Sequence, residues 1–163
     1  MRRCVTLILT FFLILAALPG YAAAKGQETE WQAIQASDGS SVEICTYADG
    51  SYLEIVTSPT VITASNSVTR TKSMNHYGSS GVLVWTAKLT ASFTYTGTSA
   101  TCTSSNLTLD YYDSSYYTVS RSATKSGAKA IANFTIGRKV LGVPTSQSSY
   151  SLRLSCDKNG TVS

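Results

Sequence analysis

The first stretch whose residue types could do chemistry is NHYGSSG, residues 75–81, where the only histidine of the chain, His76, precedes Ser79 and Ser80. A serine hydrolase needs a nucleophile, a base that accepts its proton and a group that orients the base. The GSSG segment is one residue shorter than the nucleophile elbow G-x-S-x-G. His76 also lies too near both serines, since triad residues come from separate parts of a chain. We therefore predict no catalytic residue here and expect His76 at the surface, at the entrance of a strand.

A second candidate is LDYYDSSYY, residues 109–117, where four tyrosines and two aspartates surround one predicted turn. Tyrosine rings offer flat amphipathic faces and carboxylates accept hydrogen bonds, as recognition of a sugar or a peptide requires. Tyrosine is also common in strands and Asp-Ser-Ser is a turn sequence, so Tyr111 and Tyr117 could simply face a core. The candidate binding residues are Tyr111, Tyr112, Tyr116, Tyr117, Asp110 and Asp113.

The sequence gives little support for a glycosidase site, a metal site or a nucleic-acid-binding site. A glycosidase needs two carboxylates across a cleft, and spacing alone does not decide whether Asp110 and Asp113 converge. One histidine, without a CxxC or HxxxH pattern, supplies too few ligands for zinc, and too few oxygen ligands cluster for calcium. No stripe of Lys and Arg interleaved with aromatic residues predicts a nucleic-acid partner. We therefore expect a non-enzymatic protein without a cofactor or metal.

The elements that would carry these residues show the alternation of strands. Residues 82–96, VLVWTAKLTASFTYT, place alternate apolar residues from Leu83 to Tyr95 on one face, with a bend or a change of sheet expected near Ala91. Shorter runs with the same period are 107–112, 116–123, 128–136 and 150–156. Two Asp-Gly-Ser segments, at Asp38 and Asp49, predict consecutive turn-then-strand units, as in a meander.

This pattern predicts an all-β fold, an antiparallel β-sandwich of immunoglobulin-like architecture, with a barrel as the alternative. A true immunoglobulin domain is not expected, because no tryptophan lies between Cys102 and Cys156. Residues 38–163 are predicted to form this single domain, and residues 25–37 a helical turn or a mobile lead-in.

The N-terminus has the features of a cleaved signal peptide, residues 1–24. Arg2 and Arg3 precede an apolar run over 5–18, and Ala22-Ala23-Ala24 fit the cleavage rule. The run is shorter than the roughly 20 residues of a membrane span. We therefore expect a secreted protein without a membrane anchor after cleavage.

The charge distribution indicates which partners the protein could bind, and the cysteines indicate which disulfides it could form. Residues 58–163 hold ten Lys and Arg against three Asp, which favours anionic partners such as wall polymers or lipid headgroups, or is an ordinary solubilising surface. Three cysteines follow the predicted cleavage site, and export permits disulfides. We predict a bond between Cys102 and Cys156, while pairing of Cys45 with either remains open.

The segments GVLVWTAKLTASFTYTGTSATCT and YSLRLSCDKNG, within about residues 75–163, resemble a family of small exported proteins of unknown function from Gram-positive, clostridia-like bacteria. The resemblance implies export and a β fold, and it carries over no functional residues. The leading hypothesis is a secreted, non-enzymatic module that binds an anionic cell-wall polymer, a glycan or a protein. The alternatives are an exported small toxin or inhibitor and, third, a hydrolase.

Overall fold

The computed structural model describes residues 28–35 and 37–163 of the chain. The predicted signal peptide lies outside the described residues. Over the described ranges the secondary structure is all β, in ten strands. No helix in this part of the chain has the length and apolarity that crossing a bilayer requires.

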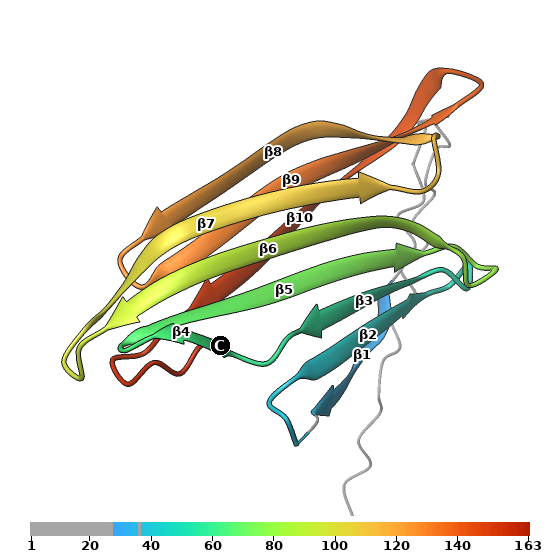
Figure 1. The fold of residues 1–163 in the computed structure, drawn as a ribbon. Coiled ribbons are helices and arrows are strands. Elements are labelled where there is room, and N and C mark those ends of the chain that lie inside the picture. Colours follow the sequence, from blue (N-terminus) through green and yellow to red (C-terminus); the bar gives the residue numbers. More distant parts are fainter. Residues whose placement is uncertain (1–27, 36) are drawn as a thin grey trace, which may run out of the picture.

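The strands form two sheets in which every pairing is antiparallel (Figure 1). The larger sheet has the order β1-β2-β3-β5-β6-β7, with β4 paired to β5, and the smaller has the order β10-β9-β8. Two separate sheets packed face to face confirm the predicted antiparallel β-sandwich. The strands are β1 (Glu28–Gln35), β2 (Ser41–Tyr47), β3 (Tyr52–Thr57), β4 (Val61–Ala64), β5 (Ser67–Tyr77), β6 (Leu83–Tyr95), β7 (Ala100–Tyr111), β8 (Tyr116–Ser126), β9 (Lys129–Val140) and β10 (Val143–Ser155).

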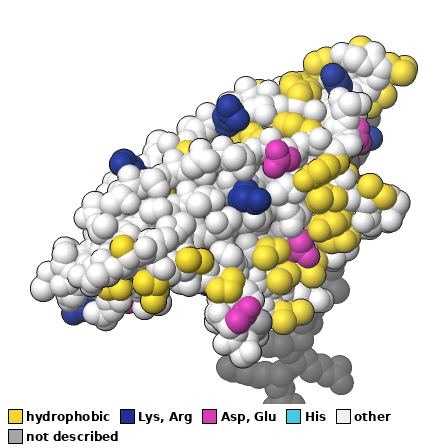
Figure 2. All heavy atoms as spheres, viewed as in Figure 1, with side chains coloured by type: hydrophobic (Ala, Val, Ile, Leu, Met, Phe, Trp, Pro, Cys, Tyr) yellow, Lys and Arg dark blue, Asp and Glu magenta, His cyan; other side chains and the backbone are white. Residues whose placement is uncertain are grey.

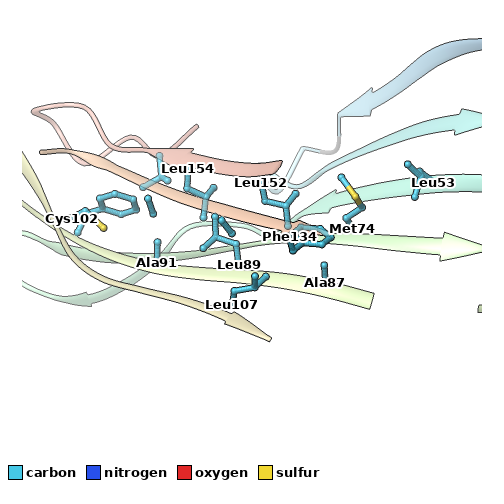
Figure 3. Packing of buried hydrophobic residues seen from close by; sticks show 14 of the residues in the cluster. Leu53, Met74, Ala87, Leu89, Ala91, Cys102, Leu107, Phe134, Leu152 and Leu154 are labelled. Carbon is cyan, nitrogen blue, oxygen red and sulfur yellow. The ribbon is translucent and has the colours of Figure 1, made fainter. Parts of the chain in front are cut away.

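The core lies between the two sheets, where β6 faces β9 and β10 (Figure 3). Trp85 and Phe134 meet edge to face, with ring centroids 6.2 Å apart. Small residues such as Ala87 and Ala132 let the backbones of the two sheets approach each other. Each large buried side chain contributes about 2 kcal/mol relative to an exposed one, so Trp85, Leu89 and Phe93 in β6 make a large contribution to stability.

Two local predictions are confirmed. The run at 82–96 forms β6, and its pairing with β7 shifts register between Ser92 and Phe93, next to the bend expected near Ala91. The two Asp-Gly-Ser turns are alike. Asp38 Oδ1 accepts hydrogen bonds from the amide of Ser40 at 2.9 Å and from its hydroxyl at 2.6 Å, and Asp49 binds Ser51 at the same distances. These turns precede β2 and β3, which pair as a meander.

The expectation of a helical turn or mobile lead-in at residues 25–37 is wrong for residues 28–35, which form β1. This strand pairs with β2, and Trp31 lies opposite Cys45. The edge of β2 offers unpaired backbone amides and carbonyls, which an extended segment satisfies. A helix of this length would be marginal by itself in water, so pairing with the sheet is the more stable choice.

Candidate functional site

Four polar residues form a row across the outer face of the larger sheet. Glu54 in β3 lies opposite Asn75 in β5, which lies opposite Thr86 in β6, and Thr86 in turn lies opposite Asp110 in β7. Side chains alternate between faces along a strand. Since the neighbours of Glu54 and Thr86 along their strands, including Leu53 and Trp85, point into the core, these four residues share the outward face. We call Glu54, Asn75, Thr86 and Asp110 the polar row.

Hydrogen bonds orient three members of the polar row. The hydroxyl of Thr86 donates to Asn75 Oδ1 at 3.0 Å, and Asn75 Nδ2 donates to Glu54 Oε1 at 2.9 Å. The hydroxyl of Tyr77 donates to the same Glu54 oxygen at 3.3 Å. Asp110 lies exposed at the other end of the row. The result is a pre-oriented line of hydrogen-bonding groups that ends in a carboxylate on each side.

Tyrosines occupy the same face next to the polar row, toward the end of the sheet. Tyr52 and Tyr77 lie opposite each other on β3 and β5 and stack, with ring centroids 4.5 Å apart and 11° between the planes. Tyr112 follows β7, donates its amide to the carbonyl of Val84 at 2.9 Å and is 62 % exposed. We call Tyr52, Tyr77 and Tyr112 the tyrosine shelf. Figure 2 shows hydrophobic side chains gathered at this end of the face, with acidic side chains beside them.

The shelf is electrostatically coupled to the polar row. Partial burial raises the pKa of Tyr77, and the negative charge of Glu54 and the hydrogen bond to it raise that pKa further. Tyr77 therefore stays protonated at neutral pH and keeps its hydroxyl directed at Glu54. The ring and the carboxylate are held in one arrangement before any ligand arrives.

The four tyrosines predicted from residues 109–117 are divided among three places. Tyr111 and Tyr116 pack against the core, and the hydroxyl of Tyr111 lies 2.7 Å from that of Thr118. The ring of Tyr117 covers Gly137 in β9, where a Cβ would lie 2.5 Å from its Cζ atom. Only Tyr112 belongs to the exposed shelf.

The two predicted aspartates have different roles. Asp110 belongs to the polar row on β7, whereas Asp113 lies in the turn that follows. The carboxylate of Asp113 accepts hydrogen bonds from the amide and hydroxyl of Ser115, at 2.8 and 2.7 Å, and these bonds lower its pKa. Asp113 therefore stabilises the β7–β8 turn.

His76 is not the surface residue expected from its polar neighbours. It lies near the end of β5 on the inward face, half-buried, and its ring stacks on Trp85 with centroids 5.4 Å apart. Burial lowers the pKa of His76, Arg138 lowers it further and Asp49 opposes both. The physical reason is that β5 continues through Tyr77, so alternation after Met74 turns His76 toward the core.

No disulfide joins two cysteines in the described residues, so the predicted bond between Cys102 and Cys156 is not formed in this structure. Both thiols are buried, and burial raises the pKa of each. The amide of Cys102 donates to the carbonyl of Gly127 and that of Cys156 to the carbonyl of Ala128. Both residues thus flank the same β8–β9 turn.

Sequence reasoning missed Tyr52, Tyr77, Glu54, Asn75 and Thr86. A signal was present in β3, where Tyr52, Glu54 and Val56 alternate with Leu53 and Ile55. Within the described ranges, no group of His, Cys, Asp and Glu side chains could hold a metal ion.

No protein-family model, curated protein or solved structure matches this chain.

Proposed function

We propose that the protein is a secreted, non-enzymatic β-sandwich module that binds a glycan chain on the outer face of its larger sheet. The observation that carries the proposal is the stacked pair Tyr52–Tyr77 beside the polar row. Sugar rings present apolar C–H faces that pack on aromatic rings, and hydroxyls that exchange hydrogen bonds with carboxylates and amides. The signal-peptide features of residues 1–24 support export.

Pre-orientation of the face supports binding. Glu54 already holds Asn75 and Tyr77, and Asn75 holds Thr86, so few side-chain rotations are lost when a ligand docks. The face is the open outer surface of a paired sheet, and a polymer can extend along it. Such a face favours an extended chain over a small enclosed ligand.

Charge narrows the class of glycan. Glu54 and Asp110 place a carboxylate at each end of the polar row, and Lys88 lies two residues beyond Thr86 along β6, opposite Ser73 and Thr108. The two carboxylates would repel an anionic wall polymer at this face. A neutral glycan or one that carries amino groups fits better.

The spacing of the carboxylates supports binding without cleavage. Glu54 and Asp110 are separated by three strand-to-strand steps, which corresponds to about 14 Å between their backbones. Glycosidases hold their two carboxyl groups about 5 to 10 Å apart across the scissile bond. His76 lies on the opposite, inward face and cannot serve as a base here.

The test is a screen of the purified protein on arrays of neutral, amino-bearing and anionic glycans, followed by calorimetric titration of the best ligand. Tyr52→Ala should weaken affinity about tenfold or more, since it removes a stacked ring. Asn75→Ala should weaken it as well, because Glu54 and Thr86 lose their orientation. Thermal unfolding of each variant reports whether the fold survives.

The matched control is Tyr117→Ala, which removes a tyrosine from the smaller sheet. Its affinity for the glycan should equal that of the wild type. Absence of binding to every glycan, or an unchanged affinity in a folded Tyr52→Ala variant, would contradict the proposal. Release of sugar fragments during long incubation would contradict its non-enzymatic part.

A further inference from the structure

The β9–β10 hairpin ends in an exposed apolar tip, formed by Val140, Leu141 and Val143. Val140 pairs with Val143, so Leu141 and Gly142 make a two-residue turn. The side chain of Leu141 is 99 % exposed, that of Val143 63 % and that of Val140 48 %. Figure 1 shows this hairpin projecting beyond the ends of the strands around it.

The backbone of the tip does not explain its sequence. Leu141 has a φ of 51° and Gly142 of 81°, so both central residues adopt positive φ, as in a type I′ turn. Asparagine or glycine is preferred at the first of these positions, and a leucine there is strained. Solubility also disfavours an exposed leucine. Because neither turn stability nor solubility accounts for Leu141, its apolar side chain points to a binding role.

Positive charge lies directly behind the tip. Lys139 is exposed, and its amide is held by the carbonyl of Ser115. Arg138 lies 5.7 Å from the ring centroid of Tyr116, which fixes the guanidinium at the base of the hairpin. Figure 2 shows a Lys or Arg side chain next to the hydrophobic tip.

The smaller sheet as a whole carries an excess of positively charged side chains. Residues 116–155 contain no Asp or Glu. Their six cations are Arg121, Lys125, Lys129, Arg138, Lys139 and Arg153. Outside this sheet, Asp113 in the β7–β8 turn interacts with Arg138, which lowers the pKa of that carboxyl, so Lys139 and the other cations carry most of the attraction for an anionic surface.

We propose that the β9–β10 hairpin docks the protein on an anionic lipid bilayer, an activity separate from the glycan site. Leu141, Val140 and Val143 enter the boundary between headgroups and acyl chains, while Arg138 and Lys139 meet the lipid phosphates. The tip projects and carries apolar side chains on both sides of the turn. Lipids can rearrange around such a shape when it inserts.

The test uses the full chain as cells release it, with its N-terminus determined by mass spectrometry. Sedimentation with vesicles of equal parts phosphatidylglycerol and phosphatidylcholine should show binding, and vesicles of phosphatidylcholine alone should bind at least tenfold less. Leu141→Asn should reduce partitioning about tenfold or more. This substitution suits the type I′ turn, so the variant should unfold at the same temperature as the wild type or higher.

Two further variants complete the experiment. Lys139→Gln should lower partitioning on the anionic vesicles about fivefold, since it removes one headgroup contact. The matched control is Ile62→Asn, which replaces an exposed apolar residue in β4 and should leave partitioning unchanged. Any contribution of the N-terminal segment is common to all variants. Equal binding by the wild type and Leu141→Asn, no binding to anionic vesicles, or equal binding to neutral ones would overturn the proposal.

Discussion

The guanidinium of Arg70 donates a hydrogen bond to the main-chain carbonyl of Val162, 92 residues further along the chain. The same side chain donates to the carbonyl of Ser58 at 2.8 Å and to that of Gly39 at 2.7 Å. Arg70 therefore joins the C-terminal segment to the turn before β2 and to the segment after β3. Val162 is itself buried and pairs with Cys156, so the contact closes one end of the sandwich.

Replacement of Arg70 by methionine should lower the free energy of unfolding by about 2 kcal/mol, because it removes charge-assisted hydrogen bonds and leaves partly buried carbonyls without their donor. Urea denaturation followed by tryptophan fluorescence measures this change. Arg153→Met, at an exposed position of β10, is the control and should change stability by about 0.5 kcal/mol or less. Equal midpoints for the two variants would show that Arg70 does not hold the C-terminal segment.

The ring of Tyr117 and the backbone of Gly137 should be energetically coupled. A Cβ at Gly137 would lie 2.5 Å from the ring, so Gly137→Ala must displace Tyr117 and should destabilise the protein by about 1 kcal/mol. In a Tyr117→Ala background the same substitution should cost much less, since the space above Gly137 is then empty. Equilibrium unfolding of the four proteins of this double-mutant cycle tests the coupling. Additive effects would mean that Tyr117 moves aside freely.

Oxidised glutathione should join Cys102 to Cys156. Each disulfide formed consumes one oxidised glutathione and releases two reduced molecules, and the protein loses two hydrogen atoms. Because burial raises the pKa of both thiols, the reaction should be slow at neutral pH and faster at higher pH. Closing this loop should stabilise the fold by about 4 kcal/mol in the chain-entropy description.

Intact-protein mass spectrometry and thermal unfolding, with and without reductant, follow the disulfide. Cys102→Ala should abolish both the mass loss and the stabilisation, and Cys45→Ala should abolish neither. A mass loss that disappears only in Cys45→Ala would assign the bond to a different pair.

Stability should fall as the pH drops through the titration of His76. Burial holds the pKa of His76 below its usual 6.5 in the folded protein, so the unfolded chain binds this proton more tightly. The contribution is complete above about pH 6.5, decreases down to the folded-state pKa and is constant below it. Thermal unfolding between about pH 7 and pH 5 should show this decrease.

His76→Gln provides the comparison for that pH dependence. It cannot take up the proton, so its unfolding temperature should change less over the same range. Asp38, Asp49, Asp113 and Asp157, whose pKa values are lowered from 3.8, lose their stabilising effect only at more acidic pH. Parallel curves for wild type and His76→Gln would mean that His76 does not contribute.

Strand prediction succeeded where the inward residues are apolar and failed where they are not. β6 and β9 alternate between apolar and polar residues, and both were predicted from that period. β5 was missed although it lies between β3 and β6 in the larger sheet. Its inward positions include Arg70, Lys72 and His76, whose polarity conceals the alternation. The groups that these side chains contact lie in other strands and in loops distant in the sequence.

The candidate site was only partly predictable, because most of its residues come from strands that are distant in the sequence. The sequence drew attention to Tyr112 and Asp110 by their local density of tyrosine and carboxylate. The shelf and the polar row also need Tyr52, Glu54, Tyr77 and Thr86, which are distant in sequence and come together through strand register. Register between non-consecutive strands such as β3 and β5 depends on the burial of both faces of the whole sheet.

The sequence by itself determined the all-β fold class, the limits of β6 to within one residue and the two Asp-Gly-Ser turns. These follow from interactions between residues close in the chain, namely side-chain alternation and short-range hydrogen bonds. The tertiary structure decided that residues 28–35 join the sheet and that His76 turns inward. It also distributed four neighbouring tyrosines among the core, the shelf and the smaller sheet, namely Tyr111, Tyr112, Tyr116 and Tyr117. Those outcomes depend on which strands pair and in what register. Pairing and register are set by the free energy of the whole sandwich, so they cannot be read from any single segment.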